Sequence, residues 1–245
     1  MIDYQILRSR RKTLALQVKQ GQVFVRAPLY LDEQFISAFI QKKEAWLKAK
    51  ITAQNITVDL CCDYTQGAKI FLFGQLVTLN IIFTCSVSKN DIYRSTLDNN
   101  QQVLVIVFPF YKQKNLTLKS QLTAAVKKSI ERYLKQQAIN IILPNVEQYS
   151  QITQLVPTSI KIRQYRARWG SCNNRGELNF NYLLMMLPIT VINYVIVHEL
   201  CHLRYLNHST DFWQLVAKHY PDYEIAKQWI KTHQAALQWQ QPSAP

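Results

Sequence analysis

The pattern of apolar and polar positions divides the chain into a strand-rich first part and a helix-rich second part. Residues 6–26 alternate in the manner of strands around a turn at 19–22, which predicts a hairpin. A helix is then predicted from Asp32 to about residue 52. Its expected inner face is Phe35, Phe39, Ala45, Trp46 and Ala49. Further strand-like runs are residues 69–83, 92–97 and 102–108, with turns at 73–75 and 98–100.

The second part begins with the periodicity of a long helix, residues 116–142, which Pro144 is expected to end. Two short strands, 158–163 and 177–181, flank a turn at 173–176. Three helices are predicted to follow: one introduced by Pro188 and Thr190, one at about 210–219 and one at about 222–238.

These elements predict an α+β fold with two associated parts. The first, residues 1–112, is a mostly β region with one helix. The second, residues 113–245, carries a helix that packs on a small sheet. The sequence contains no repeat, low-complexity tract or long flexible linker, so the two parts are expected to associate closely and could form one continuous domain.

The most informative stretch is His-Glu-x-x-His, formed by His198, Glu199 and His202 within an apolar helical segment. Residues four apart lie on one face of a helix, with Cβ atoms roughly 5–6 Å apart, so two imidazoles can reach one ion. Glu199 lies about 100° round the helix, beside the pair, where a carboxylate can act on a water without binding the metal. The pattern indicates a zinc site with Glu199 as general base.

A catalytic zinc site needs a third protein ligand, and His208 is the candidate. In a continuous helix it would lie about 9 Å beyond His202, too far for zinc bonds of about 2 Å. The helix must therefore end, and Asn207, which tolerates the left-handed conformation, is the expected point. Ser209 is then the predicted N-cap of the next helix, with Asp211 in its first turn.

Two other side chains are alternative candidates for metal ligands. Cys201 lies on the flank of the histidine face opposite Glu199, but a small buried apolar role fits it better. Glu224 is an alternative third ligand, although nothing in its helical position requires it to face the metal. Either residue would leave the pair His198 and His202 unchanged.

The segment that precedes the metal helix offers four further residues. Arg166 and Arg168 could bind carbonyl or carboxylate groups of a substrate, or could form structural pairs at the edge of a strand. Trp169 and Trp213 are interpreted as core anchors rather than as platforms for a substrate.

Composition adds a strongly basic balance. The 245 residues include 29 Lys and Arg against 15 Asp and Glu, a formal net charge of +14. This charge permits weak electrostatic contact with nucleic acid, although no Lys/Arg block has the length of a nucleic-acid tail. No apolar stretch is long enough to span a bilayer, so no membrane association is expected.

The cysteines indicate a reducing compartment. There are five, an odd number without zinc-ribbon spacing, and Cys61 and Cys62 are adjacent. The N-terminus lacks the apolar run of a signal peptide, so the expected location is the cytoplasm.

Several segments together resemble the YgjP-like metallopeptidase family, which is related to the SprT-like and minimal-gluzincin zinc peptidases. They are Arg11-Lys12-Thr13-Leu14-Ala15-Leu16, Val25-Arg26-Ala27-Pro28, Arg168-Trp169-Gly170-Ser171-Cys172 and residues 198–213. The resemblance implies a zincin-like catalytic domain, zinc on His198, His202 and His208, and Glu199 as general base.

The histidine spacing also resembles that of metzincins, which have Gly where Tyr205 stands. A metzincin also requires a Met-turn after the helix, whereas Met185 and Met186 precede it. The sequence therefore argues against that clan.

The leading hypothesis is a zinc-dependent metallohydrolase, and more specifically a peptidase with one zinc ion per chain and a polypeptide substrate. Residues 158–172 could bind such a substrate as an added strand. One alternative is a metal-dependent hydrolase of nucleotide phosphoanhydrides, but no carboxylate cluster for magnesium is apparent. The other is a non-enzymatic nucleic-acid or protein adaptor with a structural zinc, which would need a fourth ligand.

Overall fold

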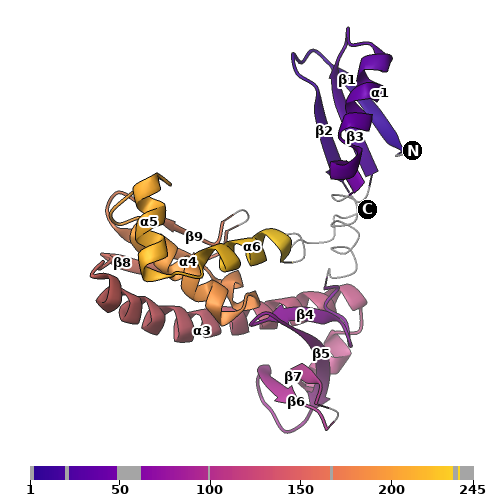
Figure 1. The fold of residues 1–245 in the computed structure, drawn as a ribbon. Helices are drawn as coiled ribbons and strands as arrows, with labels where there is room; N and C mark the ends of the chain where they lie inside the picture. The colour runs from indigo at the N-terminus through magenta and orange to yellow at the C-terminus, as the bar shows by residue number, and fades with distance from the viewer. Residues whose placement is uncertain are drawn as a thin grey trace. The chain divides into compact units, whose positions relative to one another are not determined.

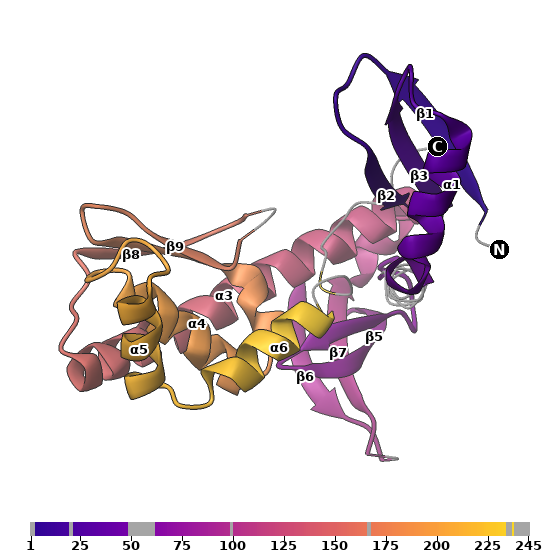
Figure 2. The same ribbon diagram turned by 45° about the horizontal axis from the view of Figure 1, so that its top comes forward.

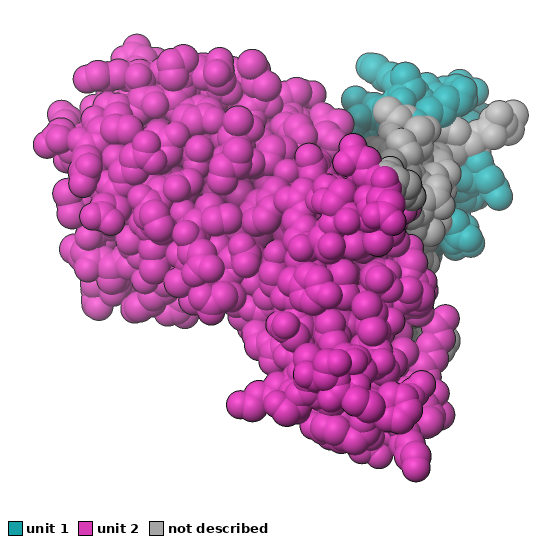
Figure 3. All heavy atoms as spheres, turned by 90° about the horizontal axis from the view of Figure 1, so that it is seen from below, with its two compact units in different colours: residues 1–61 teal, residues 62–245 magenta. Residues whose placement is uncertain are grey.

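The computed structural model describes residues 3–19, 22–48, 62–98, 100–165, 168–233 and 237. The chain forms two compact units, residues 1–61 and residues 62–245 (Figure 3). The expected division near residue 112 falls inside the second unit. The physical reason is that strands from residues 69–109 and the helices after residue 119 bury their apolar side chains in one shared core.

The first unit is a three-stranded sheet with a helix. Its strands are β1 (Tyr4–Ser9), β2 (Ala15–Lys19) and β3 (Gln22–Pro28), in the order β1-β3-β2, and α1 is Glu33–Lys42. Strands β2 and β3 form the expected hairpin, with Lys19 opposite Gln22. Strand β1, however, is separate and pairs parallel with β3, so residues 6–26 are not one hairpin. A guanidinium N–H of Arg8 donates to the carbonyl of Leu31, at 2.6 Å, and links β1 to the chain beyond β3.

The inner face of α1 differs from the expected one. Ile36, Ile40 and Leu47 are buried against β3, whereas Phe35 and Trp46 are 59% and 45% exposed. The helix also stops at Lys42 and helical structure resumes at residue 44, which shifts the later positions round the axis. The aromatic residues therefore gave the wrong face, and the predicted helix end near residue 52 lies outside the described residues.

The second unit opens with a four-stranded sheet. Its strands are β4 (Lys69–Leu72), β5 (Gln75–Thr84), β6 (Asp91–Thr96) and β7 (Gln102–Pro109), in the order β4-β5-β7-β6. Strands β5 and β7 are parallel, and the two outer pairs are antiparallel. Figure 2 shows this sheet against the N-terminal half of the long helix α3. The sequence predicted these strands and the Phe73-Gly74 turn correctly.

The β4–β5 turn packs against the segment that leads into the helix of the His-Glu-x-x-His stretch. The backbone N–H groups of Phe73 and Gly74 donate to the carbonyls of Met185 and Met186, at 2.8 and 3.1 Å. Gly74 has φ +77°, and a Cβ there would lie 2.5 Å from Cγ of Pro188. Both the conformation and the close approach therefore require glycine at this position.

Helix α3 (Lys119–Thr153) is longer than expected because it continues through Pro144. Proline removes one backbone hydrogen bond, but buried side chains on both sides of it keep the helix in place. They recur every four residues from Val126 to Val146, and Asn145 donates to the side chain of Asn193, at 2.7 Å. The helix ends at Gln154, which adopts the left-handed conformation. The prediction that Pro144 ends the helix was wrong because tertiary packing outweighs the lost bond.

A second sheet and three helices complete the unit. The strands are β8 (Ser159–Arg163), β9 (Gly170–Cys172) and β10 (Glu177–Asn181), in the order β8-β10-β9. Helices α4 (Ile189–Cys201), α5 (Thr210–His219) and α6 (Tyr223–His233) follow, and 3₁₀ turns η1 (Phe110–Asn115) and η2 (Tyr182–Met186) precede α3 and α4. Figure 1 shows α4 between α3 and the last two helices.

The architecture confirms an α+β fold, in which mixed sheets and helices share the core of the second unit. Within the described residues, no helix has both the length and the apolar character needed to cross a membrane.

Candidate metal centre

Helix α4 consists mostly of apolar residues and is buried along most of its length, so packing against its neighbours stabilises it. The helix ends at Cys201. After it, the N–H groups of Leu203 and Arg204 donate to the carbonyls three residues before them, Leu200 and Cys201, as in a 3₁₀ turn. Asn207 does not adopt the left-handed conformation, so the expectation that it ends the helix was wrong. The chain instead turns back over several residues after the last helical turn.

The return of the chain is fixed at Ser209, as predicted. The Ser209 hydroxyl accepts a hydrogen bond from the backbone N–H of Phe212, at 3.3 Å, and caps α5. Asp211 lies in the first turn of this helix, where a negative charge is favourable. This cap starts α5 beside the end of α4 and places His208 next to the two histidines of α4.

The three histidines gather at one point, and we call them the histidine cluster: His198, His202 and His208. Nε2 of His198 lies 3.2 Å from Nε2 of His202 and 3.1 Å from Nε2 of His208. One ligand atom from each ring lies within 4.8 Å of the others. Two nitrogens bound to a tetrahedral zinc at about 2.0–2.1 Å would be separated by about 3.3–3.4 Å, so the spacing suits such an ion.

Two hydrogen bonds orient rings of the histidine cluster. Nδ1 of His202 lies 2.8 Å from the carbonyl oxygen of Tyr205. A carbonyl only accepts, so Nδ1 carries the proton and Nε2 presents a lone pair to the cluster. The hydroxyl of Tyr194, four residues before His198 on α4, lies 3.5 Å from Nδ1 of that ring. Partners of this kind fix the tautomer and the ring plane of a metal ligand.

Aromatic side chains of α5 form a wall beside the cluster. Phe212 stacks on His202, with ring centroids 4.5 Å apart, and Trp213 stacks on His208 at 5.6 Å. Trp213 also stacks on Tyr223, and the ammonium of Lys227 lies 4.2 Å from the centroid of its ring. Trp213 is therefore part of the site and not only the core anchor that the sequence suggested.

Burial keeps the rings neutral. It is the main cause that lowers the pKa of His198 to about 3, assisted by the other two histidines and Lys227. Burial likewise lowers the pKa of His202. A neutral imidazole is the form that binds a metal, so these two rings hold free lone pairs at neutral pH.

Glu199 is buried beside the cluster, with 6% of its surface exposed. Burial raises its pKa to about 8, and the positive charge of Arg168 partly opposes this shift. The side chain packs on Gly170 of β9, where an added Cβ would lie only 2.6 Å from Oε1 of Glu199. A buried carboxylate with little freedom to move and a pKa near neutrality is suited to accept and release a proton.

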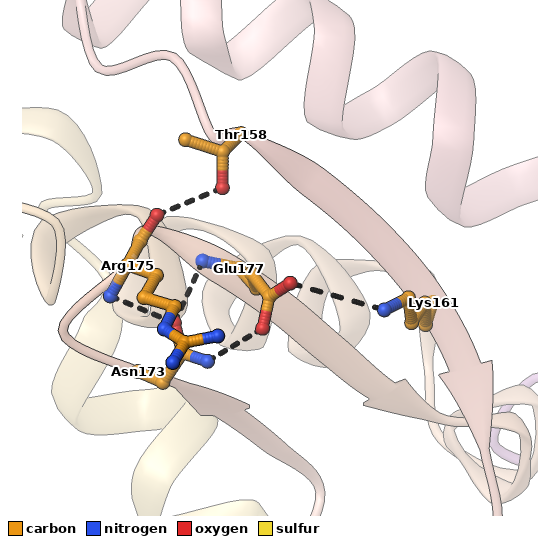
Figure 4. Close-up of polar contacts among 5 residues, drawn as sticks. All are labelled: Thr158, Lys161, Asn173, Arg175 and Glu177. Atoms are coloured by element: carbon orange, nitrogen blue, oxygen red, sulfur yellow. Dashed lines mark hydrogen bonds and ion pairs between the residues drawn. The ribbon is translucent and has the colours of Figure 1, made fainter.

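The hairpin that carries Gly170 is itself held by polar contacts, shown in Figure 4. The Asn173 side-chain oxygen accepts from the backbone N–H groups of Arg175 and Glu177, both at 3.0 Å. Thr158 donates to the carbonyl of Arg175 at 2.9 Å, and Lys161 lies 3.9 Å from the Glu177 carboxylate. These contacts tie β8, β9 and β10 together and position β9 against α4.

The alternative ligands lie outside the histidine cluster. Cys201 is fully buried and burial raises the pKa of its thiol to about 12, which agrees with the apolar role expected for it. Glu224 has a side chain 65% exposed, and it pairs with Lys227 at 3.6 Å. Arg168 is exposed, with its guanidinium 5.5 Å from the ring centroid of Tyr165. Arg166 lies outside the described residues, and Trp169 is partly buried against the main core, as expected.

Sequence reasoning missed Tyr194, Gly170 and Phe212. The first could have been found, because a residue four positions before His198 shares its helix face. The contact between Gly170 and Glu199 joins strand β9 to helix α4. These two residues are far apart in the sequence, so no local pattern predicts their contact.

The fold is α+β, and it places three clustered imidazoles beside a buried carboxylate, an arrangement that suits a metallopeptidase. The family described as "YgjP-like, metallopeptidase domain" matches residues 12–233, and the chain belongs to this family. A solved structure, the metallopeptidase zymogen of Pyrococcus abyssi abylysin, is 20% identical, with a TM-score of 0.35 over 38% of this chain and 95% of that one. No curated protein matches the chain.

Proposed function

We propose that this metallopeptidase is a zinc-dependent peptidase, in which His198, His202 and His208 hold one zinc ion and Glu199 is the general base. The observation that carries the proposal is the meeting of three imidazole nitrogens within 4.8 Å of one another beside a buried carboxylate. The donor set fits zinc, because all three ligand atoms are nitrogens, and His202 presents Nε2 as a lone pair.

Zinc held at these nitrogens would polarise a scissile carbonyl and lower the pKa of a water molecule toward about 7. Glu199 would take the proton of the attacking water at its carboxylate and pass it to the leaving amine. Gly170 would hold that carboxylate in place, since the side chain packs directly on its Cα. The edge strand β9, which carries Gly170, would bind the polypeptide substrate as an added strand.

The two alternative functions are less well supported. Hydrolysis of a phosphoanhydride normally uses carboxylates with magnesium. Across the described residues, the metal-ligand group that forms is the three-histidine one. A structural zinc in an adaptor would need a fourth protein ligand, and neither Cys201 nor Glu224 belongs to the cluster. We retain the cytoplasm as the proposed location.

The test combines metal analysis with a peptide-library cleavage assay on wild type, His202→Ala and Glu199→Gln. We expect about one zinc per chain in wild type, because three ligands and an open position define one catalytic site. His202→Ala should lose the zinc, whereas Glu199→Gln should keep zinc and lose cleavage. Unchanged metal content in His202→Ala would overturn the ligand assignment, and cleavage by Glu199→Gln at the wild-type rate would overturn the base.

A further inference from the structure

A second concave site lies along α3, and none of its lining residues belongs to the histidine cluster. It is a cleft of about 750 Å³ between α3, η1 and the loop that joins β5 to β6. Figure 2 shows α3 beside the sheet that contains β5 and β6. The lining contains five cationic side chains, which define what we call the basic cleft: Lys89, Lys112, Lys128, Arg132 and Lys135.

The cations come from separate segments that the fold brings together. Lys128, Arg132 and Lys135 are three or four residues apart on α3 and share its exposed face, opposite the buried stripe of that helix. Lys89 is in the β5–β6 loop and Lys112 is in η1. No single stretch of the sequence contains all five cations. The sequence alone therefore indicated a positive net charge but not this cleft.

Asn90 joins the walls of the basic cleft. Its side-chain oxygen accepts from the ammonium of Lys112, at 2.7 Å, and its backbone carbonyl accepts from the guanidinium of Arg132, at 3.0 Å. An ammonium has three donors and a guanidinium has five, so both keep donors for a ligand. The cations are thus held near one another by the protein's own loop.

Positive charge dominates the lining of the cleft. The lining contains five cationic side chains and one acidic residue, Glu131. Like charges gathered in a concave site repel one another and raise the local concentration of anions. A bound anion would relieve this repulsion.

The lining combines several phosphate-binding cations with an aromatic side chain. Four of the five cations are lysines, which bind phosphate as compact point charges, and Arg132 adds a guanidinium that can donate two parallel hydrogen bonds to a phosphate. Tyr111, also in the lining, is 62% exposed and offers an aromatic face. A cationic groove with an exposed aromatic ring is the arrangement that binds single strands, because phosphates lie on the charges and a base stacks on the ring.

We propose that the basic cleft binds single-stranded nucleic acid through its phosphodiester backbone, with Tyr111 as a stacking surface for one base. This site is separate from the histidine cluster. Its occupancy therefore requires neither metal nor Glu199.

The test measures fluorescence anisotropy of a labelled oligothymidylate of about 12 nucleotides, a length within known site sizes. The variant is Lys89→Gln/Lys128→Gln, which removes exposed charges from two walls of the cleft. The matched control is Lys218→Gln/Lys231→Gln, which removes two exposed charges from α5 and α6. Melting curves check that both proteins fold.

We expect the cleft variant to bind at least about tenfold more weakly, and the control to bind within about twofold of wild type. For single strands, the slope of log affinity against log salt is about −0.7 for each phosphate contact, so the cleft variant should lose about 1.4 from that slope. Tyr111→Ala should weaken binding at least about fivefold, whereas Tyr111→Phe keeps the stacking face and should not.

Three results would overturn the proposal. One is equal loss of affinity in the cleft and control variants, which would mean diffuse attraction to the net charge. Another is equally tight, cleft-dependent binding of polyglutamate, which would make the ligand an acidic polypeptide. The third is a free nucleoside triphosphate bound as tightly as the oligonucleotide, which would define a nucleotide pocket. Oligonucleotide binding that persists in EDTA and in Glu199→Gln supports the proposal, and it does so even if the peptidase assignment proves wrong.

Discussion

The histidine cluster and the basic cleft are two polar sites built in opposite ways on the same unit. The cluster is partly buried and walled by aromatic rings, and two of its three rings have hydrogen-bond partners at Nδ1. The basic cleft is open and lined by five long cationic side chains, four of which are exposed. The directions of the imidazole lone pairs determine which ligand the histidine cluster can hold. The density of positive charge determines which ligands the basic cleft attracts. Substitutions should therefore have large, specific effects at the cluster and graded, salt-dependent effects at the cleft.

The largest effect is expected for Glu199→Gln. The amide keeps the size of the side chain but cannot accept a proton, and general-base catalysis contributes about 10²–10⁴-fold. Peptide turnover should fall by that order, while zinc content and melting temperature stay near the wild-type values. Near-normal turnover with zinc bound would remove Glu199 from the mechanism, and another group would have to act as the base.

Gly170→Ala tests whether the position of the carboxylate matters as much as its presence. The added Cβ would lie 2.6 Å from Oε1 of Glu199 and must displace that side chain. A displacement of about 1 Å can cost roughly 10²-fold in rate, so turnover should fall by about that factor with zinc retained.

Gly67→Ala is the matched control for Gly170→Ala. Gly67 has φ +80° with no neighbour within 4 Å of the added carbon. It should lose roughly 1–2 kcal/mol of stability from backbone strain and keep its turnover per folded molecule. Equal activity losses in the two variants would show that the effect of Gly170→Ala is only one of stability.

Tyr194→Phe should weaken zinc binding by about 10–100-fold, the usual effect of removing a group that orients a metal ligand. The lost hydroxyl lies 3.5 Å from Nδ1 of His198. Competition with a chelating indicator measures the affinity. Tyr220→Phe removes a hydroxyl that donates to the Thr190 carbonyl at the other end of α4, and it should leave zinc affinity unchanged.

The raised pKa of Glu199 makes a pH prediction for the metal-free protein. Between pH 4.5 and about 8 the unfolded chain carries the ionised carboxylate, while the folded chain still binds the proton. Wild-type stability should therefore fall relative to Glu199→Gln as pH rises through this window, by at most about 1.4 kcal/mol per pH unit. Urea unfolding in EDTA at several pH values measures the difference, and a constant gap would contradict the buried, protonated carboxylate. The histidines are common to both proteins, so their titration cancels.

The smallest effect is expected for Lys128→Gln in the basic cleft. The side chain is exposed and its charge is repelled by the other cations, so stability should change by less than about 0.5 kcal/mol. Chemical denaturation measures it. A loss of stability as large as that of Gly67→Ala would mean that the charges of the cleft stabilise the fold and are not free for a ligand.

The sequence predicted most where the chemistry is local. The spacing of His198 and His202 and the cap at Ser209 are short-range patterns, and the structure brings the three histidines together as those patterns imply. The Phe73-Gly74 turn was also predicted, because left-handed backbone strongly favours glycine.

The failures occurred where distant parts of the chain meet. Pro144 stays inside α3 because packing on both sides outweighs one lost hydrogen bond. Phe35 and Trp46 are exposed, whereas Ile36, Ile40 and Leu47 are buried, and the break at Lys43 changes the face of the positions that follow it. The basic cleft could not be predicted, since its cations come from three segments with no common motif.

The docking of the β4–β5 turn onto η2 has a consequence for the order of events during synthesis. Gly74 leaves the ribosome long before Met186, to which it is hydrogen-bonded, and before Pro188, on which it packs. The surface of the β4–β5 turn therefore stays exposed during synthesis, because its contact with η2 cannot form until the second half of the chain has emerged. The histidine cluster emerges later still, so a nascent chain interrupted before His208 has most of its buried core residues but lacks one of the three imidazoles that we propose as metal ligands.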